Sequence, residues 1–126
     1  MKPLRDCRLY TFIDTAYLHG RDPGDLTQQL CDGGSDLIQV RAKDWPPEET
    51  RRLAEQVLEV TRRNEVGVVI NDHPDLAADL QADILHLGQE DFFDAGHQEV
   101  AVLKRSLKTS DYCAFAMKNY RRLSVP

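Results

Sequence analysis

Short apolar runs alternate with longer segments of helical pattern along this chain, and that alternation constrains the fold more than any other feature. Four runs typical of β-strands fall at residues 8–14, 36–41, 66–70 and 83–87. Between them, apolar residues recur three and four positions apart, as in helices. This is the pattern of βαβ units, whose strands form a parallel sheet. The chain is therefore expected to be an α/β protein.

Local signals mark where the predicted helices begin and end. Asp22, which stands before a proline, is typical of a helix N-cap, and Gly33 is a typical stop. Asp44, followed by Pro46, Pro47, Glu48 and Glu49, predicts the start of a second helix, with acids where the helix dipole favours them. Asn64 predicts its end. A short third helix is expected over residues 73–80.

The length of the chain limits the architectures that this pattern allows. At 126 residues it is expected to be one domain, residues 1–126, without internal repeats or flexible linkers. Two architectures fit: a doubly wound open sheet, and a (β/α)8 barrel or part of one. Both bind ligands at the carboxyl ends of their strands. Polar residues that follow the strands should therefore share one edge of the sheet.

Cationic and amide side chains follow the second predicted strand. Gln39, Arg41 and Lys43 alternate, so an extended segment would point all three to one face. A planar guanidinium and an ammonium together suit a phosphate or pyrophosphate. This end of the sheet is therefore predicted to bind a phosphorylated ligand.

Carboxylates follow the third and fourth predicted strands. Asp72 comes directly after Asn71, and Asp91 comes directly after Gln89 and Glu90. Mg²⁺ in proteins binds one or two carboxylates together with substrate phosphates. We therefore expect Asp72 and Asp91 to bind one Mg²⁺ ion beside the phosphorylated ligand.

Each of these residues also has a simpler structural interpretation. The two cations could pair with Asp44 or Glu48 as solvated loop charges, and Asp72 and Asp91 could each cap the helix that follows. Their recurrence at three successive strand ends favours a shared site. His86 lies inside a predicted strand, where a buried, hydrogen-bonded histidine is expected and not a metal ligand.

Composition excludes several classes of partner. The formal net charge of -5 and the pI of about 5.3 give no basic surface for nucleic acid. No apolar segment reaches the length of a signal peptide or a membrane-spanning helix, so no membrane association is expected. Cys7, Cys31 and Cys113 are far apart and outside any CxxC spacing. They are predicted to be reduced packing residues of a cytoplasmic protein.

Three segments of the sequence resemble the thiamine phosphate synthase family. They are RLYTFID (residues 8–14), QVRAKD (residues 39–44) and VVINDHPDLAADLQADILHLGQED (residues 68–91). The resemblance covers about residues 8–97, and IND followed by HLGQED is its most specific part. It implies a TIM barrel of (β/α)8 type. It also implies an enzyme that joins hydroxymethylpyrimidine pyrophosphate to a thiazole phosphate, yielding thiamine phosphate and pyrophosphate.

The resemblance further implies roles for individual residues. Those expected to bind the small-molecule phosphorylated substrates are Gln39, Arg41, Lys43, Asn71 and Ser110, the last where the family has a phosphate-binding serine. Arg41 and Lys43 would also be the catalytic residues, and Asp72 and Asp91 would bind Mg²⁺. The implied mechanism is dissociative: pyrophosphate leaves, and the thiazole nitrogen captures the pyrimidine-methyl cation. It needs no general base.

The resemblance covers only part of the family's length. A full barrel of this kind takes roughly 200 residues, whereas this chain has 126 and shows about four βα units. Residues 104–126 diverge from the family, and no glycine-rich phosphate loop follows Gly96. We therefore expect the N-terminal half of a barrel that cannot hold the thiazole phosphate and lacks turnover. Its open sheet edges predict self-association, for example as a homodimer.

Two alternatives to a synthase function remain open. One is a thiazole tautomerase-like protein, which ranks lower because Lys43, Asp72 and Asp91 are the set that a synthase needs. The other is a non-catalytic fragment that binds a phosphorylated ligand or associates with another half-barrel.

Overall fold

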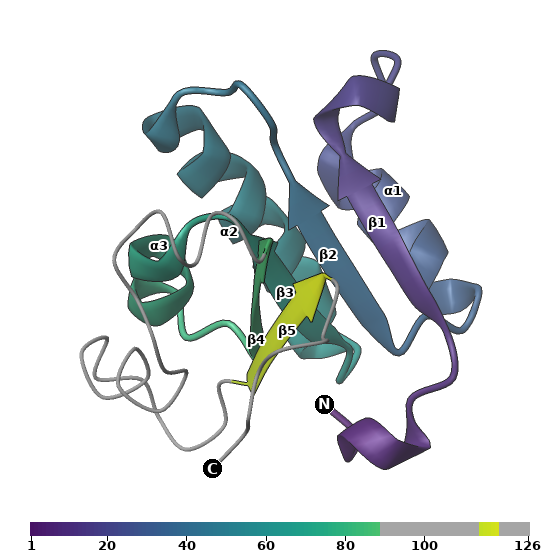
Figure 1. The fold of residues 1–126 in the computed structure, drawn as a ribbon. Helices are drawn as coiled ribbons and strands as arrows, with labels where there is room; N and C mark the ends of the chain where they lie inside the picture. Colours follow the sequence, from purple (N-terminus) through teal and green to yellow (C-terminus); the bar gives the residue numbers. More distant parts are fainter. Residues whose placement is uncertain (89–113, 119–126) are drawn as a thin grey trace, which may run out of the picture.

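Five strands form one parallel sheet in the computed structural model, which describes residues 1–88 and 114–118 (Figure 1). The strands are β1 (Tyr10–Asp14), β2 (Leu37–Arg41), β3 (Gly67–Asn71), β4 (Ile84–Gly88) and β5 (Ala114–Lys118). Their order in the sheet is their order in the chain, and each neighbouring pair is parallel. The predicted α/β fold with a parallel sheet is confirmed.

The first four strands lie within two residues of their predicted bounds. β5 was not predicted, because its segment was assigned only to the divergent tail. Its backbone pairs with β4 from Ile84 opposite Ala114 to Gly88 opposite Lys118. The described sheet therefore has β1 at one edge and β5 at the other.

Helices connect the first four strands. They are α1 (Pro23–Asp32), α2 (Pro47–Arg63) and α3 (Pro74–Asp79), with short 3-10 turns η1 (Leu4–Asp6) and η2 (Thr15–Tyr17). Asp22 caps α1 as predicted, because its carboxylate accepts a hydrogen bond from the amide of Asp25 at 2.9 Å. The predicted start of α2 at Pro46, Pro47, Glu48 and Glu49 is confirmed, with Pro46 as the N-cap and both acids in the first turn. Asp44 lies before the helix, in a turn with a φ of 66°. Within the described ranges, no helix has the length and apolarity needed to cross a membrane.

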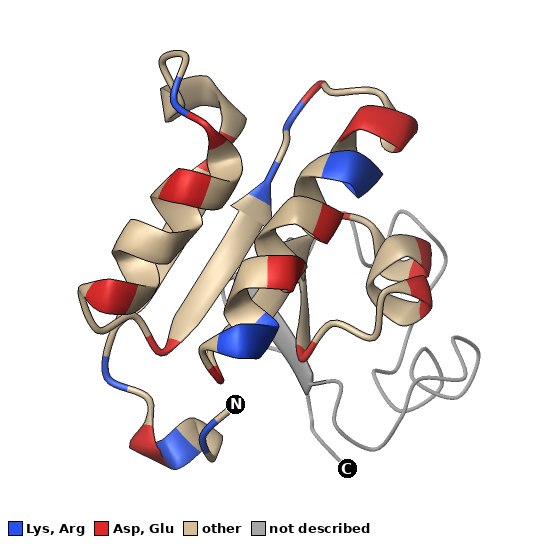
Figure 2. Ribbon diagram, turned by 180° about the vertical axis from the view of Figure 1, so that it is seen from behind, with Lys and Arg blue, Asp and Glu red and all other residues tan. Residues whose placement is uncertain are grey.

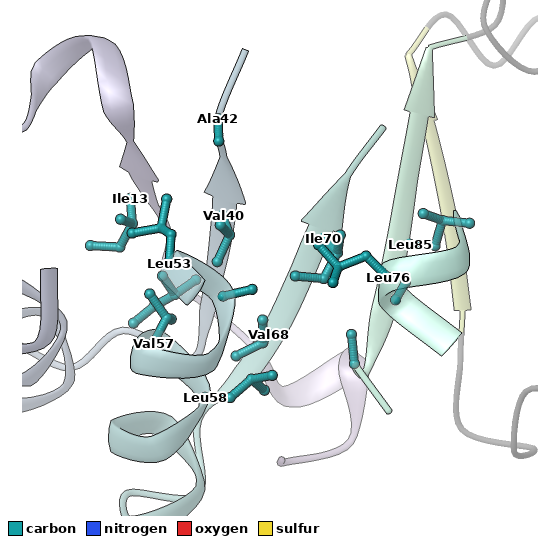
Figure 3. Packing of buried hydrophobic residues seen from close by; sticks show 14 of the residues in the cluster. Ile13, Val40, Ala42, Leu53, Val57, Leu58, Val68, Ile70, Leu76 and Leu85 are labelled. Carbon is teal, nitrogen blue, oxygen red and sulfur yellow. The ribbon is translucent and has the colours of Figure 1, made fainter. Parts of the chain in front are cut away.

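The helices pack together on one face of the sheet (Figures 1 and 3). One buried cluster joins the strands to α2 and α3 through Ile13, Val40, Ile70, Leu85, Leu53, Val57 and Leu76. Leu26 and Leu30 of α1 pack against the same cluster. A doubly wound sheet carries helices on both faces, whereas a barrel wall carries them on one and keeps its strands in sequential order. The fold is therefore of the TIM-barrel type, and five strands make an incomplete barrel.

The opposite face of the sheet corresponds to the interior of a barrel and is called the inner face here. Its side chains come from every second position of β1 to β4, glycines apart: Tyr10, Phe12, Asp14, Leu37, Gln39, Arg41, Val69, Asn71, Ile84 and His86. Near the amino ends of the strands, Cys7 packs against a buried apolar group on this face. Cys7 and Cys31 are free, partly buried thiols, as predicted, and Cys113 lies outside the described residues.

Asp36 fastens the N-terminal segment at the amino ends of the strands. Its carboxylate accepts hydrogen bonds from Lys2 Nζ at 2.8 Å and from the amides of Arg8 and Leu9 at 2.6 and 3.0 Å. The Lys2 ammonium, followed by these two amides, holds the pKa of Asp36 well below its usual range. This cluster lies at the opposite end of the strands from the predicted ligand site.

Candidate active site at the carboxyl ends of the strands

The strand register places three predicted site residues on the inner face. The neighbouring pairs on this face are Phe12 with Gln39, Asp14 with Arg41, and Asn71 with His86. Side chains alternate between the two faces of a strand, so these six share one face. The prediction that Gln39 and Arg41 point the same way is confirmed, and Asn71 joins them from the next strand.

Gln39 is buried on the inner face with one unsatisfied polar atom. Its exposed fraction is 2%, and its Nε2 donates a hydrogen bond to the hydroxyl of Tyr10 at 2.7 Å. Its carbonyl oxygen Oε1 is buried and has no hydrogen-bond partner in the described structure. Leaving a buried acceptor unpaired costs about 1–3 kcal/mol. This oxygen is therefore an acceptor that the described part of the protein leaves without a donor.

Tyr10 and Phe12 form an exposed aromatic surface beside Gln39. Their rings stack with centroids 5.2 Å apart, and 39% and 51% of these residues is exposed. Burial of the phenol raises the pKa of Tyr10, while the hydrogen bond from Gln39 acts in the opposite direction. The hydroxyl thus stays protonated near neutral pH, next to a flat apolar surface.

Arg41 ends β2 and faces a carboxylate of β1. Its Nε lies 3.7 Å from Asp14 Oδ2, and 40% of the Arg41 side chain is exposed. The other oxygen of Asp14 accepts a hydrogen bond from the amide of Ala16 at 2.9 Å. The structure therefore pairs Arg41 with neither Asp44 nor Glu48, and sequence reasoning missed Asp14. The available signal was its position at the end of β1, level with Arg41 at the end of β2.

Lys43 lies beyond the strand, so the alternation argument does not extend to it. β2 ends at Arg41, and residues 42–45 turn, with the amide of Trp45 donating to the carbonyl of Ala42 at 3.3 Å. Lys43 is exposed, in the loop that leads from β2 to α2. Figure 2 shows basic residues at the end of β2 and in this loop. Its position allows it to reach a ligand at the strand ends without being fixed there.

Asn71, Asp72 and His86 form a hydrogen-bonded chain across β3 and β4. Asn71 Nδ2 donates to Asp72 Oδ2 at 2.9 Å, and Asn71 Oδ1 lies 2.9 Å from His86 Nδ1. Asn71 is 7% exposed, and His86 is partly buried. His86 is therefore a hydrogen-bonded strand residue, as predicted. Asp72 does not cap α3, whose N-cap is His73 without a side-chain bond.

Asp72 supplies an exposed carboxylate and borders a cavity of about 350 Å³ between the starts of α2 and α3. Within residues 1–88 and 114–118, no three His, Cys, Asp or Glu side chains are grouped to hold a metal ion by themselves. Mg²⁺ does not need such a group, because water and substrate phosphates complete its coordination. One carboxylate at the same edge of the sheet as Arg41 therefore fits Mg²⁺ shared with a phosphorylated ligand. Asp91 and Ser110, with Gln89 and Glu90, lie outside the described residues.

Comparison with known proteins gives the family of this chain from its sequence. The family model described as thiamine monophosphate synthase matches residues 9–108. A thiamine-phosphate synthase of Herpetosiphon aurantiacus is 41% identical over 86 residues, which are 68% of this chain and 42% of that protein. One from Thermus thermophilus is 48% identical over 67 residues, which are 53% of this chain and 32% of that protein.

A solved structure extends the likeness to the fold. The thiamine phosphate pyrophosphorylase from Pyrococcus furiosus superposes with a TM-score of 0.70 at 21% sequence identity, covering 90% of this chain and 50% of that one. The chain thus spans half or less of the length of these relatives. The family model covers most of its residues and includes β1 to β4. The chain belongs to the thiamine monophosphate synthase family.

Proposed function

We propose that this chain carries the pyrimidine pyrophosphate and Mg²⁺ half of a thiamine phosphate synthase active site. The reaction joins hydroxymethylpyrimidine pyrophosphate to a thiazole phosphate and releases pyrophosphate. The observation that supports it best is the shared inner face of Gln39, Arg41 and Asn71 beside Asp72, in a chain of this family. Substrates of this kind are small charged metabolites, which supports a cytoplasmic location.

The inner face offers a place for the pyrimidine ring. Phe12 is the β1 neighbour of Gln39, so a flat ring laid on the Tyr10–Phe12 surface would lie next to the unpaired Gln39 carbonyl. An N–H group on the ring would satisfy that acceptor, and stacking on an aromatic surface is favourable. These contacts would orient the ring with its methylene group toward the carboxyl ends of the strands.

The strand ends suit the departing pyrophosphate. As the bond between the methylene carbon and oxygen breaks, its electron pair leaves with pyrophosphate, and negative charge grows on the phosphate oxygens. Arg41 and Lys43 would donate hydrogen bonds to those oxygens, and preorganised cations of this kind stabilise developing charge. Mg²⁺ held by Asp72, and by Asp91 if it reaches the same edge, would supply further positive charge. The thiazole nitrogen then forms the new bond to the methylene carbon.

The test is titration calorimetry of the 126-residue chain with inorganic pyrophosphate and Mg²⁺. We expect binding that needs both components. Arg41→Met and Lys43→Met keep the apolar stem and should each weaken it about tenfold, or about 1.4 kcal/mol, with little change in Tm. Arg52→Met is the matched control, because Arg52 is exposed on α2, on the helix side of the sheet. If Arg41→Met behaved like Arg52→Met, Arg41 would have no part in the site.

A non-catalytic role is the second candidate. Its support is the same inner face, where Gln39, Arg41 and Asn71 could bind a phosphorylated ligand without turnover. Calorimetry and an assay of thiamine phosphate formation together distinguish the two candidate functions. Pyrophosphate binding without product supports a ligand-binding role, and formation of thiamine phosphate supports the synthase.

A further inference from the structure

Asp72 is held in an unusual backbone conformation directly after β3. Its φ is 65°, a left-handed value that non-glycine residues adopt at a cost. Its amide donates a hydrogen bond to the carbonyl oxygen of His86 at 3.0 Å, which ties this conformation to β4. The backbone of His86 thus fixes where the Asp72 side chain begins.

The side chain of His86 reaches the same carboxylate through Asn71. A carboxylate only accepts hydrogen bonds, so the amide NH₂ of Asn71 must face Asp72 Oδ2. The carbonyl Oδ1 of Asn71 then faces the imidazole, and His86 Nδ1 must carry the proton that is donated to it. Every donor and acceptor along this chain is therefore determined.

We propose that His86 is a positioning residue for Asp72, acting through Asn71, and that this chain sets the affinity of the site for a divalent cation. The inference rests on the proposed function of Asp72 as the metal ligand. Asn71 donates its hydrogen bond to Asp72 Oδ2. The other carboxylate oxygen, Asp72 Oδ1, accepts no hydrogen bond from the described part of the chain. A carboxylate that a hydrogen bond already holds in place loses less side-chain freedom when it binds a cation. Residues that hydrogen-bond to a metal ligand in this way tune the affinity of the site for the metal.

Three substitutions of His86 separate this role from a general loss of structure. His86→Leu removes the donor, and His86→Gln places an amide near the former Nε2. His86→Asn places an amide N–H near the former Nδ1, so it should restore the bond to Asn71. Calorimetry with Mn²⁺ and inorganic pyrophosphate should show about tenfold weaker metal binding for His86→Leu and His86→Gln. His86→Asn should bind the metal within about twofold of the parent chain. Unchanged metal affinity in all three variants would overturn the proposal. So would a metal affinity of His86→Asn as weak as that of His86→Leu.

A double substitution tests the route through Asn71. If His86 acts through it, Asn71→Leu and Asn71→Leu/His86→Leu should bind Mn²⁺ with the same affinity. Additive losses would show that His86 acts on the site independently and would contradict the proposal.

The imidazole can also be examined without any metal. Long-range ¹H–¹⁵N spectra of the neutral His86 ring should show the Nδ1–H tautomer, and the Nε2–H tautomer would refute the hydrogen-bonded chain. A protein that has this tautomer yet binds no Mn²⁺ would instead refute the proposed function of Asp72. The two failures are therefore distinguishable.

Discussion

At the scale of single residues, Asp36 makes stability depend on pH. Its carboxylate accepts hydrogen bonds from Lys2 and two backbone amides, and its pKa is depressed in the folded state. The unfolded pKa is about 3.9. The contribution to stability is therefore complete above that value and is lost as the pH falls below it.

We expect the urea midpoint to fall between pH 6 and pH 3, and Asp36→Asn to flatten that fall. The variant loses the charge that the Lys2 ammonium and the two amides favour, so less of its stability depends on carboxylate ionisation. Glu55→Gln, on the exposed side of α2, should keep the slope of the parent chain. Identical slopes for Asp36→Asn and the parent would show that this cluster does not govern acid unfolding.

The site residues differ in how far the sequence could predict them. The shared face of Gln39 and Arg41 follows from strand alternation alone, so it was predicted correctly. The position of Lys43 depends on where β2 ends, and the turn after Arg41 removes it from that face. The contacts of Tyr10 with Gln39 and of Asp14 with Arg41 join different strands, so they depend on the register of the sheet.

At the scale of elements, α2 packs against the sheet and contributes buried apolar side chains to the core. Leu53 and Val57 are buried against the strands, with exposed fractions of 2% and 0%, while Glu55 between them is exposed. Leu53→Ala should lower the free energy of unfolding by about 2–5 kcal/mol, because it removes buried methyl groups and leaves a cavity. Glu55→Ala should change it by less than about 0.5 kcal/mol. Urea denaturation measures both, and similar small effects would contradict the packing of α2.

The presence of a helix or strand was more predictable than its first and last residues. The first four strands and α1 to α3 follow from apolar periodicity, which reflects burial. Asp44, predicted as part of the start of α2, lies before it, because a residue type that suits a helix start also suits a left-handed turn, and the sequence alone does not distinguish them. β5, AFAMK, was missed because its segment was assigned to the divergent tail, and its strand structure is seen in the pairing with β4.

At the scale of the whole molecule, the inner face and the β1 edge predict self-association of the 126-residue chain. An edge strand offers unpaired backbone groups, and Tyr10 and Phe12 expose aromatic surface beside it. We expect sedimentation velocity to show dimers or larger species at micromolar concentration. Phe12→Thr should shift the distribution toward monomer, because threonine suits a strand but removes the aromatic surface.

Tyr17 provides the control for this experiment. It is 66% exposed in η2, outside the sheet, so Tyr17→Ser should leave the distribution unchanged. A sharp monomer peak for the parent chain would contradict the expectation, as would an equal response to both substitutions.

The sequential strand order also bears on how this protein is made. From β1 to β4, each strand pairs with the one synthesised just before it, so no strand waits for a distant partner. Contacts across the sheet join neighbouring βα units, with Tyr10 and Gln39 separated by 29 residues and Asn71 and His86 by 15. Ribosomes release the N-terminal part of a chain first. The sheet can therefore grow strand by strand during translation, and Asn71 and His86 can meet only after β4 has left the ribosome.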